Sequence, residues 1–302
     1  MSGRLAGGAL LLAALAGACG GEERPEAGSS VPELEPLVRV DGLEGPESVA
    51  RDGRRGRWLV VGGGEAGRGG GGYLAAVPAR GDTGDRHARD AGPAGLRLDA
   101  PRGIVVRGDT AWIADLRRVV AVDLAADSVL FELVIEGGER LDDLARGVAG
   151  PLFVSDARAD AIWRVATDGS GQARVGAVGS LRGPDGLLAE DLPSGEARLV
   201  VAGSEGAVLT LDADSSVTML AGSPSFRRLD GLQLAPDGAL LVGDRETGRI
   251  HHLRRPSPEV WRTGDPWLTD LEGPADFAVV DSLLALPEAG ADRLTVYRVV
   301  GG

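Results

Sequence analysis

Short apolar runs alternate with polar, glycine-rich turns from about residue 35 to the end of the chain. Six segments share one order, in which a polar residue comes just before an apolar strand begins. They are "GPESV" (45–49), "APRGI" (100–104), "LDDLA" (141–145), "GPDGL" (183–187), "LDGLQ" (229–233) and "GPADFA" (273–278). The polar residues of this column are Glu47, Arg102, Asp143, Asp185, Asp230 and Asp276. The column repeats about every 46 residues, which indicates an internally repeated fold.

Each segment is followed by a second and a third apolar run. After the segment at 100–104 these runs are "AWIAD" and "RVVAVDL", and "DSVLFELVI" is a candidate fourth strand. Four short strands in a unit of 40 to 50 residues are typical of a propeller blade. Two separate β domains are the alternative, but the unbroken period favours one closed ring. We therefore predict an all-β, six-bladed β-propeller over residues 35–302.

Closure of this ring needs a strand from the other end of the chain. The last repeat ends after its third strand, "LTVYRVV" (294–300), while "EPLVRV" (35–40) stands before the first segment without a partner. Open sheet edges invite aggregation. We predict that residues 35–40 supply the outer strand of the last blade.

The first residues have the features of an export signal. Arg4 is followed by an apolar run, by three small residues and by Cys19, the only cysteine. This order resembles a bacterial lipoprotein signal, which implies a signal peptide over 1–18 and lipidation of Cys19. The alternatives are an ordinary signal peptide or a membrane anchor, but the run of about eleven apolar residues is short for a bilayer span.

Residues 19–34 then form a flexible tether to a membrane. Gly20 after the lipidated cysteine fits sorting to the periplasmic face of the outer membrane of a Gram-negative cell. We expect the chain to be a monomer in the cell envelope, with the membrane as partner through Cys19.

The amino-acid composition of the chain limits the classes of molecule that it can bind. The formal net charge is −13, and the sequence contains neither lysine nor asparagine. An acidic chain lacks the clustered cations that nucleic-acid phosphates require. The absence of lysine excludes Schiff-base chemistry and a phosphate-loop lysine.

The column of polar residues is the main candidate for chemistry. In a propeller the first strand of each blade lines the central channel, so the column should form a ring of five acids and one arginine around one mouth. A single Asp-Gly pair is also explained by a tight turn, in which glycine accepts positive φ. Five neighbouring carboxylates repel one another unless something compensates them. Arg102 neutralises one, and a hard cation with oxygen ligands, such as Ca²⁺, would neutralise more.

The repeats resemble the six-bladed propellers of the gluconolactonase and senescence-marker-protein family over roughly residues 35–300. The likeness rests on "LEGPES", "RLDDL", "PDGLL" and "LDGLQ". It implies a divalent metal held by Glu44, Asp185 and Asp230, with Ca²⁺ expected first and Zn²⁺ or Mn²⁺ possible. Two asparagines of the family are aspartates here, at positions 142 and 185.

The same resemblance implies hydrolysis of a lactone or ester. A metal would polarise the carbonyl, Asp230 would be the general base, and Arg140 or Asp142 would orient hydroxyls. Fold likeness does not establish activity. The alternatives are a non-catalytic propeller that binds a small ligand or an envelope protein, and a structural lipoprotein.

Overall fold

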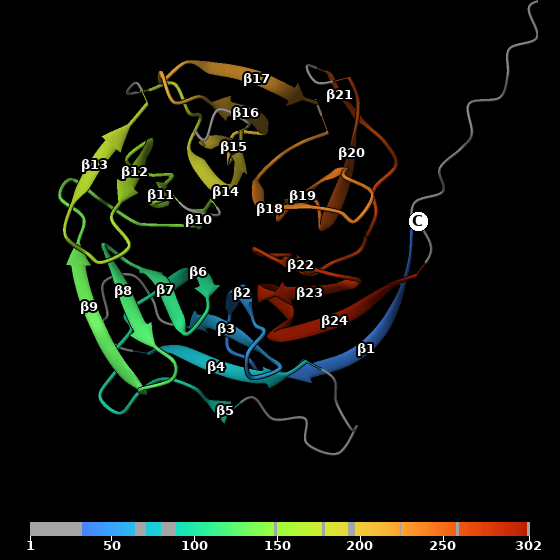
Figure 1. Cartoon of the computed structure of the whole chain (residues 1–302). Helices are drawn as coiled ribbons and strands as arrows, with labels where there is room; N and C mark the ends of the chain where they lie inside the picture. The colour runs from blue at the N-terminus through green and yellow to red at the C-terminus, as the bar shows by residue number, and fades with distance from the viewer. Residues whose placement is uncertain are drawn as a thin grey trace, which may run out of the picture. The chain divides into compact units, whose positions relative to one another are not determined.

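The computed structural model describes residues 32–63, 71–79, 89–147, 150–176, 179–192, 197–223, 225–257 and 260–300. These residues form six four-stranded antiparallel sheets arranged as a closed ring, as Figure 1 shows. The prediction of a six-bladed propeller is confirmed. In this part of the chain no helix is long and apolar enough to cross a membrane. The predicted signal peptide and Cys19 lie outside the described residues.

Each blade takes its strands in chain order from the centre of the ring outwards, and the last blade also takes β1. The first blade comprises β2 (Pro46–Asp52), β3 (Arg57–Gly63), β4 (Gly72–Pro78) and β5 (Arg89–Asp90). The second comprises β6 (Pro101–Arg107), β7 (Thr110–Asp115), β8 (Arg118–Asp123) and β9 (Ser128–Val134). The third comprises β10 (Leu144–Arg146), β11 (Leu152–Asp156), β12 (Ala161–Val165) and β13 (Gln172–Val175).

The remaining blades follow the same order. The fourth comprises β14 (Pro184–Asp191), β15 (Ala197–Gly203), β16 (Ala207–Leu211) and β17 (Val217–Gly222). The fifth comprises β18 (Leu229–Leu234), β19 (Leu240–Asp244), β20 (Arg249–Ser257) and β21 (Val260–Thr263). The sixth comprises β22 (Ala278–Val280), β23 (Leu283–Glu288), β24 (Arg293–Val300) and β1 (Glu33–Asp41).

The N-terminal strand closes the ring. β1 pairs with β24 in antiparallel register from Glu33 opposite Val300 to Asp41 opposite Arg293. The predicted closing strand is therefore confirmed, and it begins two residues before the predicted start at residue 35. Residues Val31–Gly302 form one compact unit. Because its own first and last strands complete the sixth sheet, this unit contains all of its core.

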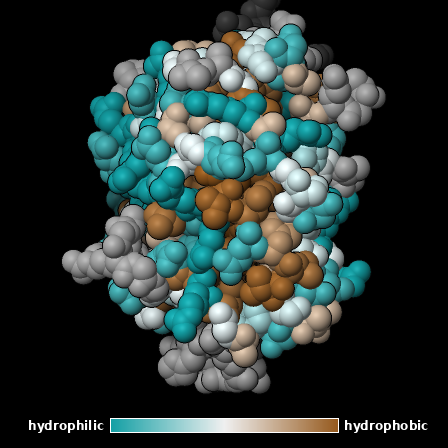
Figure 2. Space-filling model, turned by 90° about the vertical axis from the view of Figure 1, so that its left-hand side faces the viewer, coloured by the Kyte–Doolittle hydropathy of each residue, from teal (hydrophilic) through white to brown (hydrophobic). Residues whose placement is uncertain are grey.

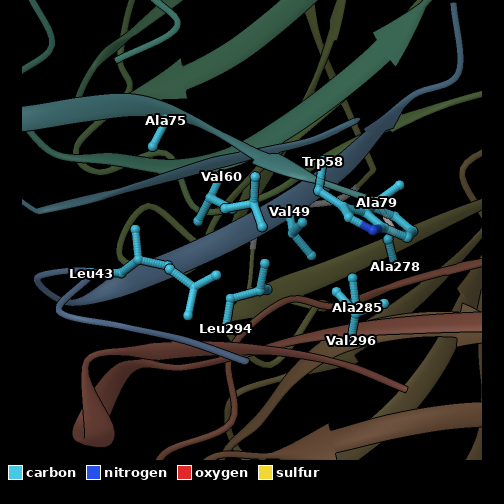
Figure 3. Packing of buried hydrophobic residues seen from close by; sticks show 12 residues of the cluster. Leu43, Val49, Trp58, Val60, Ala75, Ala79, Ala278, Ala285, Leu294 and Val296 are labelled. Carbon is cyan, nitrogen blue, oxygen red and sulfur yellow. The ribbon is translucent and has the colours of Figure 1, made fainter. Parts of the chain in front are cut away.

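The core lies between neighbouring blades, where the faces of two sheets meet. Figure 3 shows the junction of the first and sixth blades, in which Trp58 and Val60 of β3 face Ala285 and Val296 of the last blade. Trp58 is fully buried. Full burial of such a side chain stabilises the fold by about 2 to 3 kcal/mol. Trp112 and Trp163 pack in the same way in the junction of the second and third blades.

Glycines after the column residues allow the inner strands to approach closely. Gly186 has no positive φ, but a Cβ atom there would overlap the backbone oxygen of Asp230 in the next blade. At Gly231 a Cβ atom would lie 2.9 Å from the Cα of Asp276. The explanation of Asp-Gly as a positive-φ turn is therefore wrong at these two sites. Glycine is needed there because the channel is narrow.

Outer strand β9 exposes several large apolar side chains. Figure 2, which looks onto the side of the ring that includes β9, shows apolar side chains gathered on that face. Val129, Leu130 and Val134 of β9 are among the exposed large apolar residues. The apolar run that predicted a fourth strand here is therefore only half buried, since Phe131, Leu133 and Ile135 pack on the core of the second and third blades.

Candidate functional site: a ring of acids and arginines in the channel

The heads of the six inner strands meet around the channel, as the column predicted. Figure 1 shows β2, β6, β10, β14, β18 and β22 around the centre of the ring. All four aspartates of the column are buried, and Glu47 and Arg102 are partly buried. Neighbouring heads also touch: the backbone N–H of Asp276 donates to the backbone oxygen of Glu47 over 3.0 Å. The column residues therefore form a continuous ring across all six blades.

Glu47 is held between two arginines from different blades. Nη1 of Arg102 donates to Oε1 of Glu47 over 3.3 Å, and Nη1 of Arg245 donates to Oε2 over 2.6 Å. A third bond of 3.1 Å joins Nη2 of Arg245 to Oε1. The three side chains are 14 to 18 % exposed, so they remain open to a solute at the mouth.

The same arginines extend the network to two aspartates. Nε of Arg102 donates to Asp142 over 2.9 Å, and Nη2 of Arg140 lies 3.2 Å from the same carboxylate oxygen. Arg245 lies 3.3 Å from Oδ2 of Asp230. We call Glu47, Asp142 and Asp230 the arginine-bound acids. Each therefore has an opposite charge within bonding distance.

Charge pairing determines how these groups titrate. Burial opposes ionisation of Glu47, but Arg102 and Arg245 outweigh it and lower the pKa of this carboxyl. Burial also opposes the charge of Arg102, yet Glu47 and Asp142 raise its pKa further above the ordinary value. For Asp230, burial outweighs Arg245 and the pKa is raised. The network at Glu47 is therefore an ionised one at neutral pH.

The other three acids, Asp143, Asp185 and Asp276, make no ion pair within the described part of the chain, and we call them the arginine-free acids. Asp143 accepts the backbone N–H groups of Leu144 over 2.6 Å and Leu187 over 2.8 Å. Asp276 accepts the hydroxyl of Ser48 over 2.7 Å. Oδ2 of Asp185 and Oδ1 of Asp276 are buried and have no hydrogen-bond partner among the described residues.

Burial without a cation favours the neutral carboxyl. It raises the pKa of Asp276 to about 7. Burial, followed by the nearby charge of Asp276, holds the pKa of Asp143 well above its ordinary value. For Asp185, burial and then Asp230 have the same effect. A carboxyl that keeps its proton is a hydrogen-bond donor as well as an acceptor.

The predicted metal ligands are not brought together as a set of three. Asp185 and Asp230 are buried in the channel, and the charge of Asp230 acts on Asp185. Glu44 is exposed. Across the described ranges no group of three or more His, Cys, Asp or Glu side chains is arranged to hold a metal ion. Glu44 therefore does not join the other two predicted ligands, and metal binding stays a prediction.

Sequence reasoning missed Arg245, which binds two acids of the ring. It lies in the turn between β19 and β20, just after Asp244. Asp244 braces this turn, because it accepts the backbone N–H groups of Arg227 and Thr247. Arg245 could have been found from its position directly after Asp244, because the hydrogen bonds of Asp244 fix the turn that carries it.

Comparisons with known proteins identify the fold and leave the family open. No protein-family model matches the chain, and no curated protein matches it. A catalytically inactive virginiamycin B lyase from Staphylococcus aureus with quinupristin has a TM-score of 0.58 at 11% identity, covering 89% of this chain and 100% of that one. A nidogen/laminin complex contains a chain with a TM-score of 0.61 at 15% identity, covering 77% and 85%.

A third solved structure is an auxiliary nutrient binding protein from Bacteroides thetaiotaomicron. Its TM-score is 0.60 at 12% identity, and the match covers 88% of this chain and 73% of that one. The likeness supports a six-bladed propeller related in fold to lyase and nutrient-binding propellers. At these identities it shows the fold alone.

Proposed function

We propose that this chain is a lipid-anchored propeller of the cell envelope that binds a small, oxygen-rich molecule at the channel mouth without hydrolysing it. The observation that carries the proposal is the Arg102–Glu47–Arg245 network, in which each charged group is fixed by the others and still partly exposed. Fixed groups of this kind bind a ligand with little further loss of side-chain freedom.

The chemistry of the network suggests the ligand class. A guanidinium has five N–H donors in a rigid fork, and the bonds to Glu47, Asp142 and Asp230 use only some of them. Nε of Arg140 is buried without a partner among the described residues. Donors beside carboxylate acceptors suit a molecule with several hydroxyl groups and a carboxylate or lactone carbonyl, such as a sugar acid. The nutrient-binding protein of the same fold is consistent with a binding role.

Calorimetry of the compact unit Val31–Gly302 with a panel of sugar acids, their lactones and neutral sugars tests this proposal. Arg245→Gln should lower the affinity for a sugar acid at least about tenfold, because it removes charge-assisted hydrogen bonds. Arg262→Gln, an exposed arginine on β21, is the matched control. Absence of binding across the panel, or equal binding by Arg245→Gln, would refute the proposal.

A metal-dependent lactone or ester hydrolase is the second candidate. It is favoured by the electrostatic proximity of Asp185 and Asp230 and by the unpartnered Oδ2 of Asp185. A bound divalent cation would supply a Lewis acid. Turnover of lactones with Ca²⁺, Zn²⁺ or Mn²⁺, abolished by Asp230→Ala, would favour this candidate over simple binding.

The location in the envelope is a separate part of the proposal, and it rests on the sequence around Cys19. Mass spectrometry of the mature protein should find a lipid on Cys19 and no residues before it. Cys19→Ser should release the protein from the membrane fraction. A mature protein that begins elsewhere would contradict the anchor and leave the channel proposal untouched.

A further inference from the structure

A second hollow lies at the opposite end of the blades from the channel ring. Its cavity volume is about 380 Å³, and it is bounded by the third and fourth blades. Strand β14 runs from the channel mouth to the hollow. Asp185 lies near its first residue, and Asp191, its last residue, lines the hollow. Six residues of extended strand span about 20 Å. This hollow is therefore separate from the channel mouth.

The floor of the hollow is apolar. It is formed by Phe153, Val175, Leu199 and Leu211, which belong to the core between the two blades. The hollow therefore reaches the edge of this core, although Phe153, Leu199 and Leu211 are themselves largely buried. A concave apolar site of 300 to 1,000 Å³ is the usual size for a small-molecule pocket.

One cation at the rim is available to a ligand. Arg164 is exposed and lines the hollow, and within the described ranges it makes no hydrogen bond or ion pair. The neighbouring acid Asp212 already binds Nε of Arg198 over 2.7 Å. Asp191, the other acid of the lining, also has a partner. Arg164 is therefore the charged side chain of this lining that has no partner among the described residues.

We propose that this hollow is a binding site for a small apolar carboxylate, whose tail covers Phe153, Leu199 and Leu211 and whose carboxylate meets Arg164. Burial of the tail supplies affinity in proportion to the apolar area removed from water. The planar guanidinium selects the carboxylate, because it donates two parallel hydrogen bonds to it. The site is independent of the proposed function at the channel mouth.

Calorimetry of Val31–Gly302 with octanoate, octanol and octylammonium tests this assignment, since the three probes share a tail and differ in charge. Octanoate should bind at least about tenfold more tightly than octylammonium. Arg164→Gln should lower the affinity for octanoate about tenfold and change that for octanol less than about twofold. Arg262→Gln, at an exposed arginine of β21, should leave octanoate binding unchanged.

A variant that fills the hollow provides the second readout. Ala197 lines it and is only partly buried, so Ala197→Phe should weaken octanoate and octanol alike, with thermal unfolding confirming that the variant is folded. The proposal is overturned if octanoate does not bind, if Arg164→Gln binds it as tightly as the unmodified protein, or if a folded Ala197→Phe binds it normally. Failure of sugar-acid binding at the channel would not affect this result.

Discussion

The arginine-bound and arginine-free acids lie around the same channel mouth, yet the cost of their burial is compensated in different ways. Asp230 and Asp185 are 4 % and 2 % exposed. Arg245 contacts the carboxylate of Asp230, whereas no arginine contacts that of Asp185 within the described part of the chain. Acids around one channel can therefore be stabilised in two ways, some by pairing with arginines and others by keeping their protons.

Removal of a shared arginine should have the largest effect. Arg102→Ala removes one arginine partner each from Glu47 and Asp142, which are largely buried. Breaking a buried pair in this way costs about 3 to 5 kcal/mol of unfolding free energy. Urea denaturation measures the loss. Arg39→Ala, which removes an exposed pair with Asp41, is the control and should cost less than about 1 kcal/mol. Equal losses in the two variants would contradict a special role for the ring.

The pH dependence of stability should be dominated by the arginine-free acids. The pKa of Asp276 rises from 3.8 in the unfolded chain to about 7 in the fold, so the native state binds the extra proton between these values. The free energy of unfolding therefore falls as pH rises through this window. The contribution of Asp276 alone is at most about 4 kcal/mol. Asp143 and Asp185 act in the same direction.

Urea denaturation at pH 5.5 and 8.5 checks this prediction. The propeller should be more stable at the lower pH. The lowered pKa of Glu47 acts in the opposite sense, because its stabilising charge is lost only as pH falls below its ordinary value of 4.5. A protein that is more stable at pH 8.5 would show that the arginine-free acids are ionised and compensated by some other group.

Replacement of the carboxyl by an amide should change the stability in opposite directions for the two kinds of acid. Asp276→Asn imitates the protonated carboxyl and can still accept the hydroxyl of Ser48, so it should raise stability at pH 8 by about 1 to 3 kcal/mol. Glu47→Gln removes a charge that two arginines need, and it should lower stability by about 1 to 3 kcal/mol. Thermal melts of the two variants at pH 8 measure the contrast. If both variants shift the melting temperature in the same direction, the two kinds of acid do not differ as described.

Much of this architecture could be predicted from the sequence because it depends on local patterns. The six column residues recur at a nearly constant spacing, and the strand at 35–40 had no other partner. The ring itself follows from the topology of a propeller once the period is recognised.

The partners within the ring could not be predicted in the same way. Arg245 and Glu47 are 198 residues apart, and the column pattern records only the heads of inner strands. The exposed position of Glu44 depends on how the turn before β2 leaves the channel, which its "EGP" context does not determine. Gly186 was assigned to a turn because the close approach of Asp230 appears only when two blades are packed together.

The most direct test of two kinds of acid in one ring is a carbon-13 NMR titration of the aspartate carboxyl groups in Val31–Gly302. The account predicts at least one carboxyl that titrates near pH 7 and disappears in Asp276→Asn, while Glu47 in a glutamate-labelled sample titrates below its ordinary range. If every aspartate of the folded protein titrates below about pH 4.5, the arginine-free acids are ionised at neutral pH and the account is contradicted.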